Sequence, residues 1–263
     1  MRLVYSDTGS GPPLILLHGM FGDHLDWAPV LGPLSLTHRV IAPDLPGFGD
    51  SAKPDTAYDR DLFVAALDQL FEECGLAAAT LAGNSFGGQI AMLYALERPG
   101  RVERLVLIDS GGFYRYSEAE RAATLARMPG SWLRSAPGSV FRMLFEPLFV
   151  RTTADTAAYL AKQAAKPGRP DWPQMAVAAV RSIGLHTELC FLDGLGRFAC
   201  PVLILWGERD RVVPVAQGRA AVGQFARARL IEIPGCGHLP QIEHPAWVIT
   251  AVRLVCDTAN SGD

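Results

Sequence analysis

The chain is organised around one stretch, residues 80–89, which reads Thr80-Leu81-Ala82-Gly83-Asn84-Ser85-Phe86-Gly87-Gly88-Gln89. The apolar run at 79–82 predicts a short buried strand, and the pattern at 90–96 predicts a helix that ends before Pro99-Gly100. Between them, residues 83–87 match the pattern G-x-S-x-G, in which a serine stands at a sharp strand-to-helix turn. Glycines leave room beside such a turn because they lack Cβ atoms, so the Ser85 hydroxyl can be held exposed at its apex. A glycine-rich turn with an incidental serine also fits this pentapeptide, and the partners of Ser85 elsewhere in the chain must decide.

Composition bounds the class of protein. With 263 residues, 49% of them hydrophobic and 19% charged, the chain can bury a large core, either as one domain or as a domain with an inserted lobe. A net charge of −3 without a basic block argues against a nucleic-acid partner. The N-terminus lacks the apolar run of a secretory signal, and no apolar segment reaches membrane-spanning length, so we expect a cytoplasmic protein without stable membrane association. Five scattered cysteines argue against a disulfide framework or a structural zinc site: Cys74, Cys190, Cys200, Cys236 and Cys256.

Apolar runs that alternate with helical patterns predict the architecture. Runs suited to buried strands occur at 14–17, 40–42, 105–109, 202–206 and 230–233, and apolar residues recur at helical spacing over 58–74. This alternation predicts an α/β fold with a mostly parallel sheet covered by helices on both faces. Functional sites in such sheets form beyond the carboxyl ends of the strands. Five polar residues fall at or just after the end of a predicted strand: His18, Ser85, Asp109, Asp210 and His238.

The pattern changes between residues 113 and 196. This segment has no run typical of a strand, and its helical stretches are separated by proline and glycine. We interpret residues 113–196 as a helical cap inserted into a core formed by residues 1–112 and 197–263. Its large apolar side chains suggest a dry acyl or aryl pocket over Ser85, but we expect most of them to pack the cap's own small core, because large apolar residues are usually buried structure. Six of its arginines are expected at the surface, unless one binds a substrate carboxylate: Arg115, Arg134, Arg142, Arg151, Arg169 and Arg181.

A serine nucleophile needs a base that takes its proton, and the base needs a third group that orients it. His238 is the best candidate base, because it follows the last predicted strand in a loop with two glycines. Asp210, after the preceding strand, is the best candidate acid, and Asp109 remains an alternative because it also ends a strand. Asp44 lies in a Pro/Gly turn and is expected to bond to backbone there, and His18 is expected to be a structural hydrogen-bonding residue. The other four histidines are expected at the surface: His24, His38, His186 and His244.

The oxyanion that develops during acyl transfer needs two preorganised donors. One should be the N–H of Phe86, directly after the nucleophile. The other should come from the loop after the 14–17 strand, most plausibly the N–H of Met20. We also predict that Phe21, Trp132 and Leu239 contact the substrate.

Taken together, these motifs resemble the α/β-hydrolase superfamily over nearly the whole chain, with only the predicted cap unmatched. The resemblance rests on His18-Gly19, on residues 44–51 and 83–88, on Asp210 and on Gly237-His238, and on the chain order Ser, Asp, His of the triad. It implies the α/β-hydrolase fold and its Ser-His-Asp machinery. The substrate is not implied, because this fold hosts esterases, lyases, C–C hydrolases and receptors.

Branches of the superfamily differ in local motifs. Residues 84–88 and 238–245 resemble the meta-cleavage-product C–C hydrolases. Those enzymes usually carry a Gly-Gly-Gly-Pro oxyanion loop, and many have Trp where Leu239 stands here. The His-Gly-x-Phe-Gly form of residues 18–22 is more similar to small carboxylesterases. Ser85 stands where dehalogenases and epoxide hydrolases carry Asp, and Gln89 stands where menaquinone-pathway synthase relatives usually carry Arg, which argues against those classes.

We therefore expect a serine hydrolase that cleaves small-to-medium carboxylic esters through an acyl-enzyme intermediate. It is expected to need neither metal nor cofactor, and to act as a monomer or homodimer on a small-molecule ester. A C–C bond hydrolase of the meta-cleavage-product type is the enzymatic alternative, and a carboxylate-binding arginine near the pocket would support it. A ligand-binding relative that kept the triad without turnover is the alternative from another class.

Overall fold

A computed structural model of the protein describes residues 1–257; residues 258–263, which close the predicted core segment 197–263, and the side chains of Cys256 and Asp257 lie outside the described part. One seven-stranded sheet has the order β1-β3-β2-β4-β5-β6-β7. β1 pairs antiparallel with β3, and all the other neighbours are parallel, so the mostly parallel α/β sheet predicted from the sequence is confirmed. The strands are β1 (Tyr5–Thr8), β2 (Pro13–Leu17), β3 (Arg39–Pro43), β4 (Ala79–Asn84), β5 (Val102–Ile108), β6 (Val202–Gly207) and β7 (Ala228–Ile233).

The register of the sheet brings the carboxyl ends of its strands to one edge. Leu17 pairs with Gly83, Asn84 with Ile108, and Gly207 with Ile233. The residues that follow these strands therefore meet at this edge. β1 was not predicted, because it is a short polar edge strand with two exposed residues and no apolar run.

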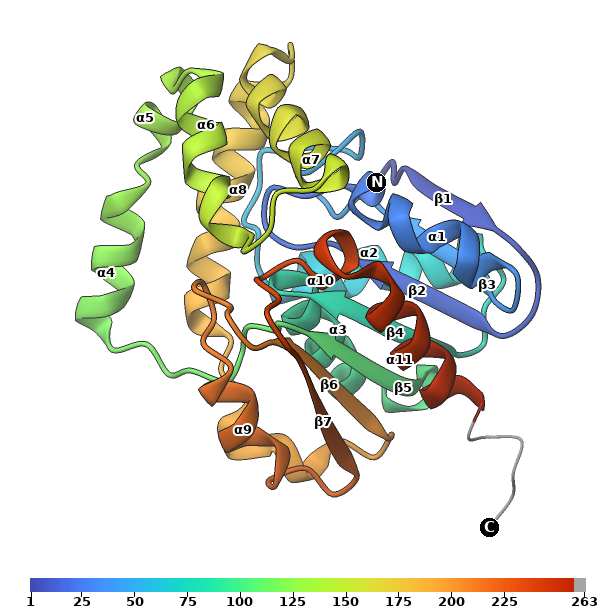
Figure 1. Cartoon of the computed structure of the whole chain (residues 1–263). Coiled ribbons are helices and arrows are strands. Elements are labelled where there is room, and N and C mark those ends of the chain that lie inside the picture. The colour runs from blue at the N-terminus through green and yellow to red at the C-terminus, as the bar shows by residue number, and fades with distance from the viewer. Residues whose placement is uncertain (258–263) are drawn as a thin grey trace.

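Helices cover both faces of the sheet (Figure 1). One face packs against α1 (Ala28–Ser35) and α11 (Pro245–Asp257) through side chains such as Val30, Leu34 and Val248. The other face packs against α2 (Arg60–Glu73), α3 (Phe86–Glu97) and α9 (Ala216–Val222). A short helix, α10 (Pro240–Glu243), precedes α11, and short 3-10 turns complete the core: η1 (His24–Trp27), η2 (Pro99–Arg101) and η5 (Leu192–Arg197).

Five helices are inserted between β5 and β6, in the segment that the sequence predicts to be a cap (Figure 1). They are α4 (Glu118–Arg127), α5 (Gly130–Ser135), α6 (Gly138–Phe145), α7 (Ala154–Ala165) and α8 (Trp172–Glu188), with the 3-10 turns η3 (Glu146–Leu148) and η4 (Lys166–Gly168). Capping boxes at Ser117 and Thr153 begin α4 and α7, because each side chain satisfies backbone N–H groups of the first turn. We call α4–α8 and their connections the cap; the boundaries 113 and 196 stay a prediction.

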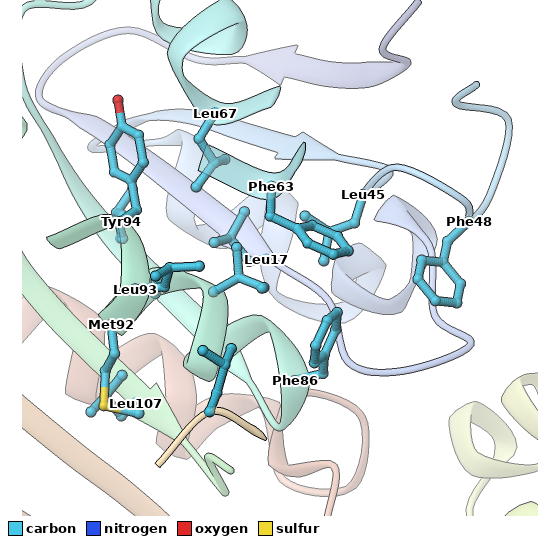
Figure 2. Close-up of a cluster of buried hydrophobic side chains, with 14 of the residues drawn as sticks. Leu17, Leu45, Phe48, Phe63, Leu67, Phe86, Met92, Leu93, Tyr94 and Leu107 are labelled. Carbon is cyan, nitrogen blue, oxygen red and sulfur yellow. The ribbon is translucent and has the colours of Figure 1, made fainter. Parts of the chain in front are cut away.

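The core anchors the start of α3, the helix that follows Ser85. Figure 2 shows the buried side chains around it, with Phe86 and Phe63 side by side. Their ring centroids are 5.3 Å apart in an edge-to-face arrangement, and Phe86 is 1% exposed. Within residues 1–257, none of the helices has the length and apolarity that crossing a membrane would require.

Candidate active site

Ser85 stands alone at the turn between β4, which ends at Asn84, and α3, which begins at Phe86. Its φ of 54° and ψ of −115° lie in a region that side chains other than glycine rarely adopt. The Ser85 N–H donates to the Ile108 carbonyl at 3.0 Å, and the Gly111 N–H donates to the Ser85 carbonyl at 3.1 Å. These bonds to β5 and to the loop after it hold the serine in its strained conformation.

The glycines of the turn are required by close approach. A Cβ atom on Gly83 would lie 2.4 Å from the carbonyl oxygen of Gly87. A Cβ atom on Gly87 would lie 2.2 Å from the carbonyl oxygen of Leu17 at the end of β2. The turn can form only if both positions lack side chains, which is the reason inferred from the sequence.

His238 and Asp210 form a buried hydrogen-bonded pair. His238 Nδ1 lies 2.7 Å from Asp210 Oδ2, and the two residues are 4% and 7% exposed. The other carboxylate oxygen, Oδ1, accepts from the N–H groups of Val212 at 2.7 Å and Val213 at 3.0 Å. Since Asp210 accepts at both oxygens, it orients the ring with a proton on Nδ1 and leaves Nε2 as the basic nitrogen.

Backbone contacts position the His238 loop from two sides. The His238 N–H donates to the carbonyl of Leu148, which belongs to the cap, at 2.7 Å. The His238 carbonyl accepts from Asn84 Nδ2 at 3.0 Å. Asn84, the residue before Ser85, therefore also holds the His238 loop, a role that the sequence did not indicate.

Ser85 and His238 line one cavity, of about 250 Å³. Within the described residues they are not hydrogen-bonded to each other in this conformation. Catalytic hydrogen bonds are often long without substrate and shorten when it binds, so the shared cavity is the relevant observation.

Asp109, the alternative acid, lies beside this pair without bonding to the histidine. Its Oδ1 accepts from the Gly207 N–H at 2.9 Å, and it is fully buried. Complete burial, followed by the nearby Asp210 carboxylate, raises the pKa of Asp109 well above its ordinary value. Asp109, Asp210 and His238 have ligand atoms within 4.8 Å of one another, a spacing compatible with a metal ion. Because Nδ1 of His238 is already engaged by Asp210, the set is better suited to orienting the imidazole than to binding a metal.

The other two candidates support loops, as expected. Asp44 accepts from the N–H groups of His24 and Asp50, each at 2.7 Å, so it holds the loop after β3. His18 accepts from the Leu45 N–H at Nε2 (2.9 Å), and its Nδ1 therefore donates to the Gly19 carbonyl (2.8 Å). Burial lowers the pKa of His18, which agrees with this neutral tautomer.

The loop that follows β2 lies against the turn at Ser85. A Cβ atom on Gly19 would lie 3.0 Å from Asn84 Oδ1 and 3.4 Å from the Ser85 Cβ, so this loop passes close to Asn84 and Ser85. Among residues 1–257, neither the Met20 N–H nor the Phe86 N–H has a hydrogen-bond partner. The Phe86 N–H also belongs to the first turn of α3, where the helix dipole favours negative charge. Both amides are free to receive an oxyanion.

The cavity is mainly apolar, and two of the three residues predicted to contact the substrate line it. Phe21 and Leu239 line it, whereas Trp132 does not: that residue lies on α5, is 38% exposed and is absent from the cavity wall. Trp132 was predicted to contact the substrate because it is a large aromatic residue of the cap. The sequence does not show which side of a cap helix faces solvent. The cavity is lined by Gly19, Met20, Phe21, Asp26, Asn84, Ser85, Met128, Leu144, Phe145, Leu148, Tyr159, Val212, His238 and Leu239.

A second hydrogen-bonded pair joins the cap to α3. His186 on α8 lies with its Nδ1 2.5 Å from Gln89 Oε1, and Gln89 Nε2 donates to the His186 and Leu189 carbonyls at 3.0 Å each. Burial lowers the pKa of His186 to about 4. His186 is therefore not the surface residue that its polar setting suggested, and His38, at 2% exposed, is not one either.

Comparisons with known proteins identify the family. Residues 14–251 match the model of the Alpha/beta hydrolase family. The chain is 32% identical to the 2-hydroxymuconate semialdehyde hydrolase of Pseudomonas sp. (strain CF600), covering 94% of this chain and 87% of the relative, and 27% identical to Lipase 3 of Moraxella sp. (strain TA144), covering 98% and 79%. Among solved structures, a thermophilic esterase from Thermogutta terrifontis superposes with a TM-score of 0.84 at 27% identity, covering 97% of this chain and 93% of that one. The relatives thus include esterases, lipases and C–C hydrolases that share one fold, and the chain belongs to the alpha/beta hydrolase family.

Proposed function

We propose that the protein is a serine esterase that cleaves small-to-medium carboxylic esters with an apolar acyl part. The observation that carries this proposal is the buried His238–Asp210 pair, whose histidine lines one small, mainly apolar cavity together with Ser85. A base that is oriented by an acid and shares a cavity with a strained, half-buried serine is the arrangement that acyl transfer requires.

The reaction proceeds in two halves. Ser85 Oγ attacks the ester carbonyl carbon while His238 Nε2 takes its proton, and the Met20 and Phe86 N–H groups stabilise the tetrahedral oxyanion. Collapse of this intermediate breaks the bond to the alcohol oxygen, which receives the proton from His238, and leaves an acyl-enzyme. His238 then takes a proton from water, and the resulting attack releases the acid and returns the proton to Ser85.

The cavity wall favours an ester over the substrate of a C–C hydrolase, although a relative of the latter kind is 32% identical. A meta-cleavage product would bring a carboxylate that needs a cation. Within the described chain no lysine or arginine lines the cavity, and the Asp26 carboxylate in its wall is already paired with Lys162. The cap segment 113–196 has eight arginines. Four of them pair elsewhere, with Asp193, Glu188, Asp50 and Asp55, and within the described chain none of the eight lines the cavity.

The test is hydrolysis of p-nitrophenyl acetate and butyrate by the wild type and by Ser85→Ala. We expect turnover with a pre-steady-state burst of p-nitrophenol in the wild type, and a kcat lower by at least about 10³-fold in the variant. A fluorophosphonate probe should label the wild type and not the variant. A 2-hydroxy-6-oxo-dienoate, assayed in parallel, should be a poor substrate.

Three results would contradict the proposal. Ester turnover that is equal in Ser85→Ala would show that the serine is not the nucleophile. Serine-dependent cleavage of the dienoate that exceeds ester cleavage would assign the protein to the C–C hydrolases instead. Binding of esters without turnover by a probe-reactive serine would favour the ligand-binding alternative.

A further inference from the structure

Two lysines of the cap reach into the core beside the oxyanion loop, which we define as residues 18–22. Lys162, on α7, donates to Asp23 Oδ1 at 2.8 Å and also to Asp26 Oδ1. Lys166, the first residue of η4, has its Nζ 3.3 Å from Asp23 Oδ2. Burial by itself would raise the pKa of Asp23, but Lys166 and Lys162 outweigh it and lower that pKa, so the carboxylate stays ionised. The four side chains form a charge-balanced network between the cap and the core.

Lys166 makes one contact that Lys162 does not. Its ammonium group donates to the backbone carbonyl of Phe21, and the lysine is 4% exposed. A buried ammonium group is costly unless its donors are satisfied, so this bond and the nearby Asp23 carboxylate account for its burial. A carbonyl of the oxyanion loop is therefore held by a cation from the cap.

Phe21 adopts a conformation that needs such support. Its φ of 61° is left-handed, which is unfavourable for a residue with a Cβ atom. Its ring packs edge-to-face against Phe141 and Phe145 of α6, with centroid distances of 6.1 and 5.8 Å. The cap thus contacts both the backbone and the side chain of this residue.

The same loop carries the second oxyanion donor. The Gly22 N–H donates to the Gly19 carbonyl at 3.0 Å, which closes a turn around Met20 and Phe21. One end of this turn lies against Ser85, and Lys166 restrains the other end through the Phe21 carbonyl. If that restraint is lost, the strained Phe21 can relax, and the Met20 N–H moves with it.

We propose that Lys166 is a positioning residue for the oxyanion hole: its bond to the Phe21 carbonyl sets the direction of the Met20 N–H, so the hole is complete only while the cap is docked on the core. This inference rests on the proposed esterase function. A misplaced donor weakens stabilisation of the transition state more than it weakens binding of the neutral ester, because the oxyanion forms only during reaction.

Three variants separate this role from general support. Lys166→Met removes the ammonium and keeps an apolar side chain of similar length. Lys166→Gln removes the charge but keeps an N–H donor for the Phe21 carbonyl. Lys162→Met removes the neighbouring charge from the same network without touching Phe21. Each is assayed for kcat and KM on p-nitrophenyl butyrate, for Ki of an alkyl trifluoromethyl ketone, which forms a hemiketal oxyanion with the serine, and for thermal unfolding.

We expect Lys166→Met to lower kcat by about tenfold to a hundredfold with little change in KM, and to raise Ki of the ketone by a similar factor. Lys166→Gln should recover most of this loss, and Lys162→Met, which leaves the bond to the Phe21 carbonyl in place, should change kcat by less than about threefold. Equal losses in the two methionine variants, no recovery with glutamine, or a loss confined to KM would overturn the inference. If Lys166→Met does not fold, the glutamine variant decides alone, since it must then keep near-wild-type kcat and Ki.

The ketone also separates this inference from the proposed function. A wild type that neither hydrolyses esters nor binds the ketone would overturn both. A wild type that binds the ketone, with equal Ki in Lys166→Met, would overturn the inference alone.

Discussion

Replacing the two buried carboxylates one at a time tests which of them serves the histidine. In Asp210→Asn, the amide oxygen is expected to stay on the Val212 and Val213 N–H groups, because it is the acceptor of the pair. The amide nitrogen then stands where Oδ2 lay, 2.7 Å from His238 Nδ1. Since that nitrogen donates, Nδ1 must accept, and the ring is driven to the tautomer with its proton on Nε2, which cannot take the Ser85 proton.

A wrong tautomer of this kind lowers kcat by about 10⁴-fold in a serine hydrolase of another fold. At 1.36 kcal/mol per decade this corresponds to about 5.4 kcal/mol of transition-state stabilisation. Asp109→Asn should behave differently. Its Oδ1 can continue to accept from the Gly207 N–H, and burial, which raises the pKa of Asp109, already disfavours the charge that the substitution removes. We expect less than a tenfold change in kcat, below about 1.4 kcal/mol.

The assay is steady-state hydrolysis of p-nitrophenyl butyrate near pH 8, with thermal unfolding as the control for folding. Both variants should melt as cooperatively as the wild type, since each keeps the shape and the backbone hydrogen bond of the residue replaced. A loss of 10³-fold or more in Asp109→Asn, with Asp210→Asn near the wild type, would refute the reasoning and identify Asp109 as the triad acid. Comparable losses in both would mean that the two carboxyls act as one unit.

Three further variants test the turn at Ser85, the cavity wall and the buried histidine of the cap. Gly87→Ala places a Cβ atom 2.2 Å from a backbone oxygen of β2, so we expect a loss of about 1–3 kcal/mol or more in urea unfolding, whereas Gly100→Ala, with no atom within 4 Å of its Cβ, should lose little. Leu144→Trp narrows the cavity, so kcat/KM for p-nitrophenyl hexanoate should fall at least about tenfold relative to acetate; Trp132→Ala, outside the cavity, should leave this ratio unchanged. Burial lowers the pKa of His186 to about 4 from the value of 6.5 that it has when unfolded. Below pH 6.5 the unfolded state therefore binds the extra proton, and the stability due to this group is present above pH 6.5 and lost as the pH falls towards 4. His186→Gln should show a shallower decline of unfolding free energy between pH 7 and pH 4.5, and an unchanged slope would contradict the assignment.

The sequence by itself determined which segments form the buried strands and which reactive side chains follow them. Continuous apolar runs indicated buried parallel strands, because residues covered on both faces leave a pattern that is readable within a few positions. The turn at Ser85 could be predicted because its glycines and its serine are neighbours in the sequence. Parallel strands share one edge for their carboxyl ends, so Asp210 and His238 could be placed near Ser85 although they lie more than a hundred residues away along the chain.

Only the tertiary structure decided between Asp210 and Asp109, since both follow a strand and the choice depends on which oxygen lies 2.7 Å from the imidazole. It also decided which cap residues face the cavity, leaving Trp132 outside and bringing in Tyr159 and Leu144. Lys166 contacts Phe21, and His186 contacts Gln89. Each contact joins a cap residue to a core residue about a hundred positions or more away in the sequence. Local patterns carry no record of such pairings, because the direction of a helix in an inserted cap is set by packing against the core and not by its own periodicity.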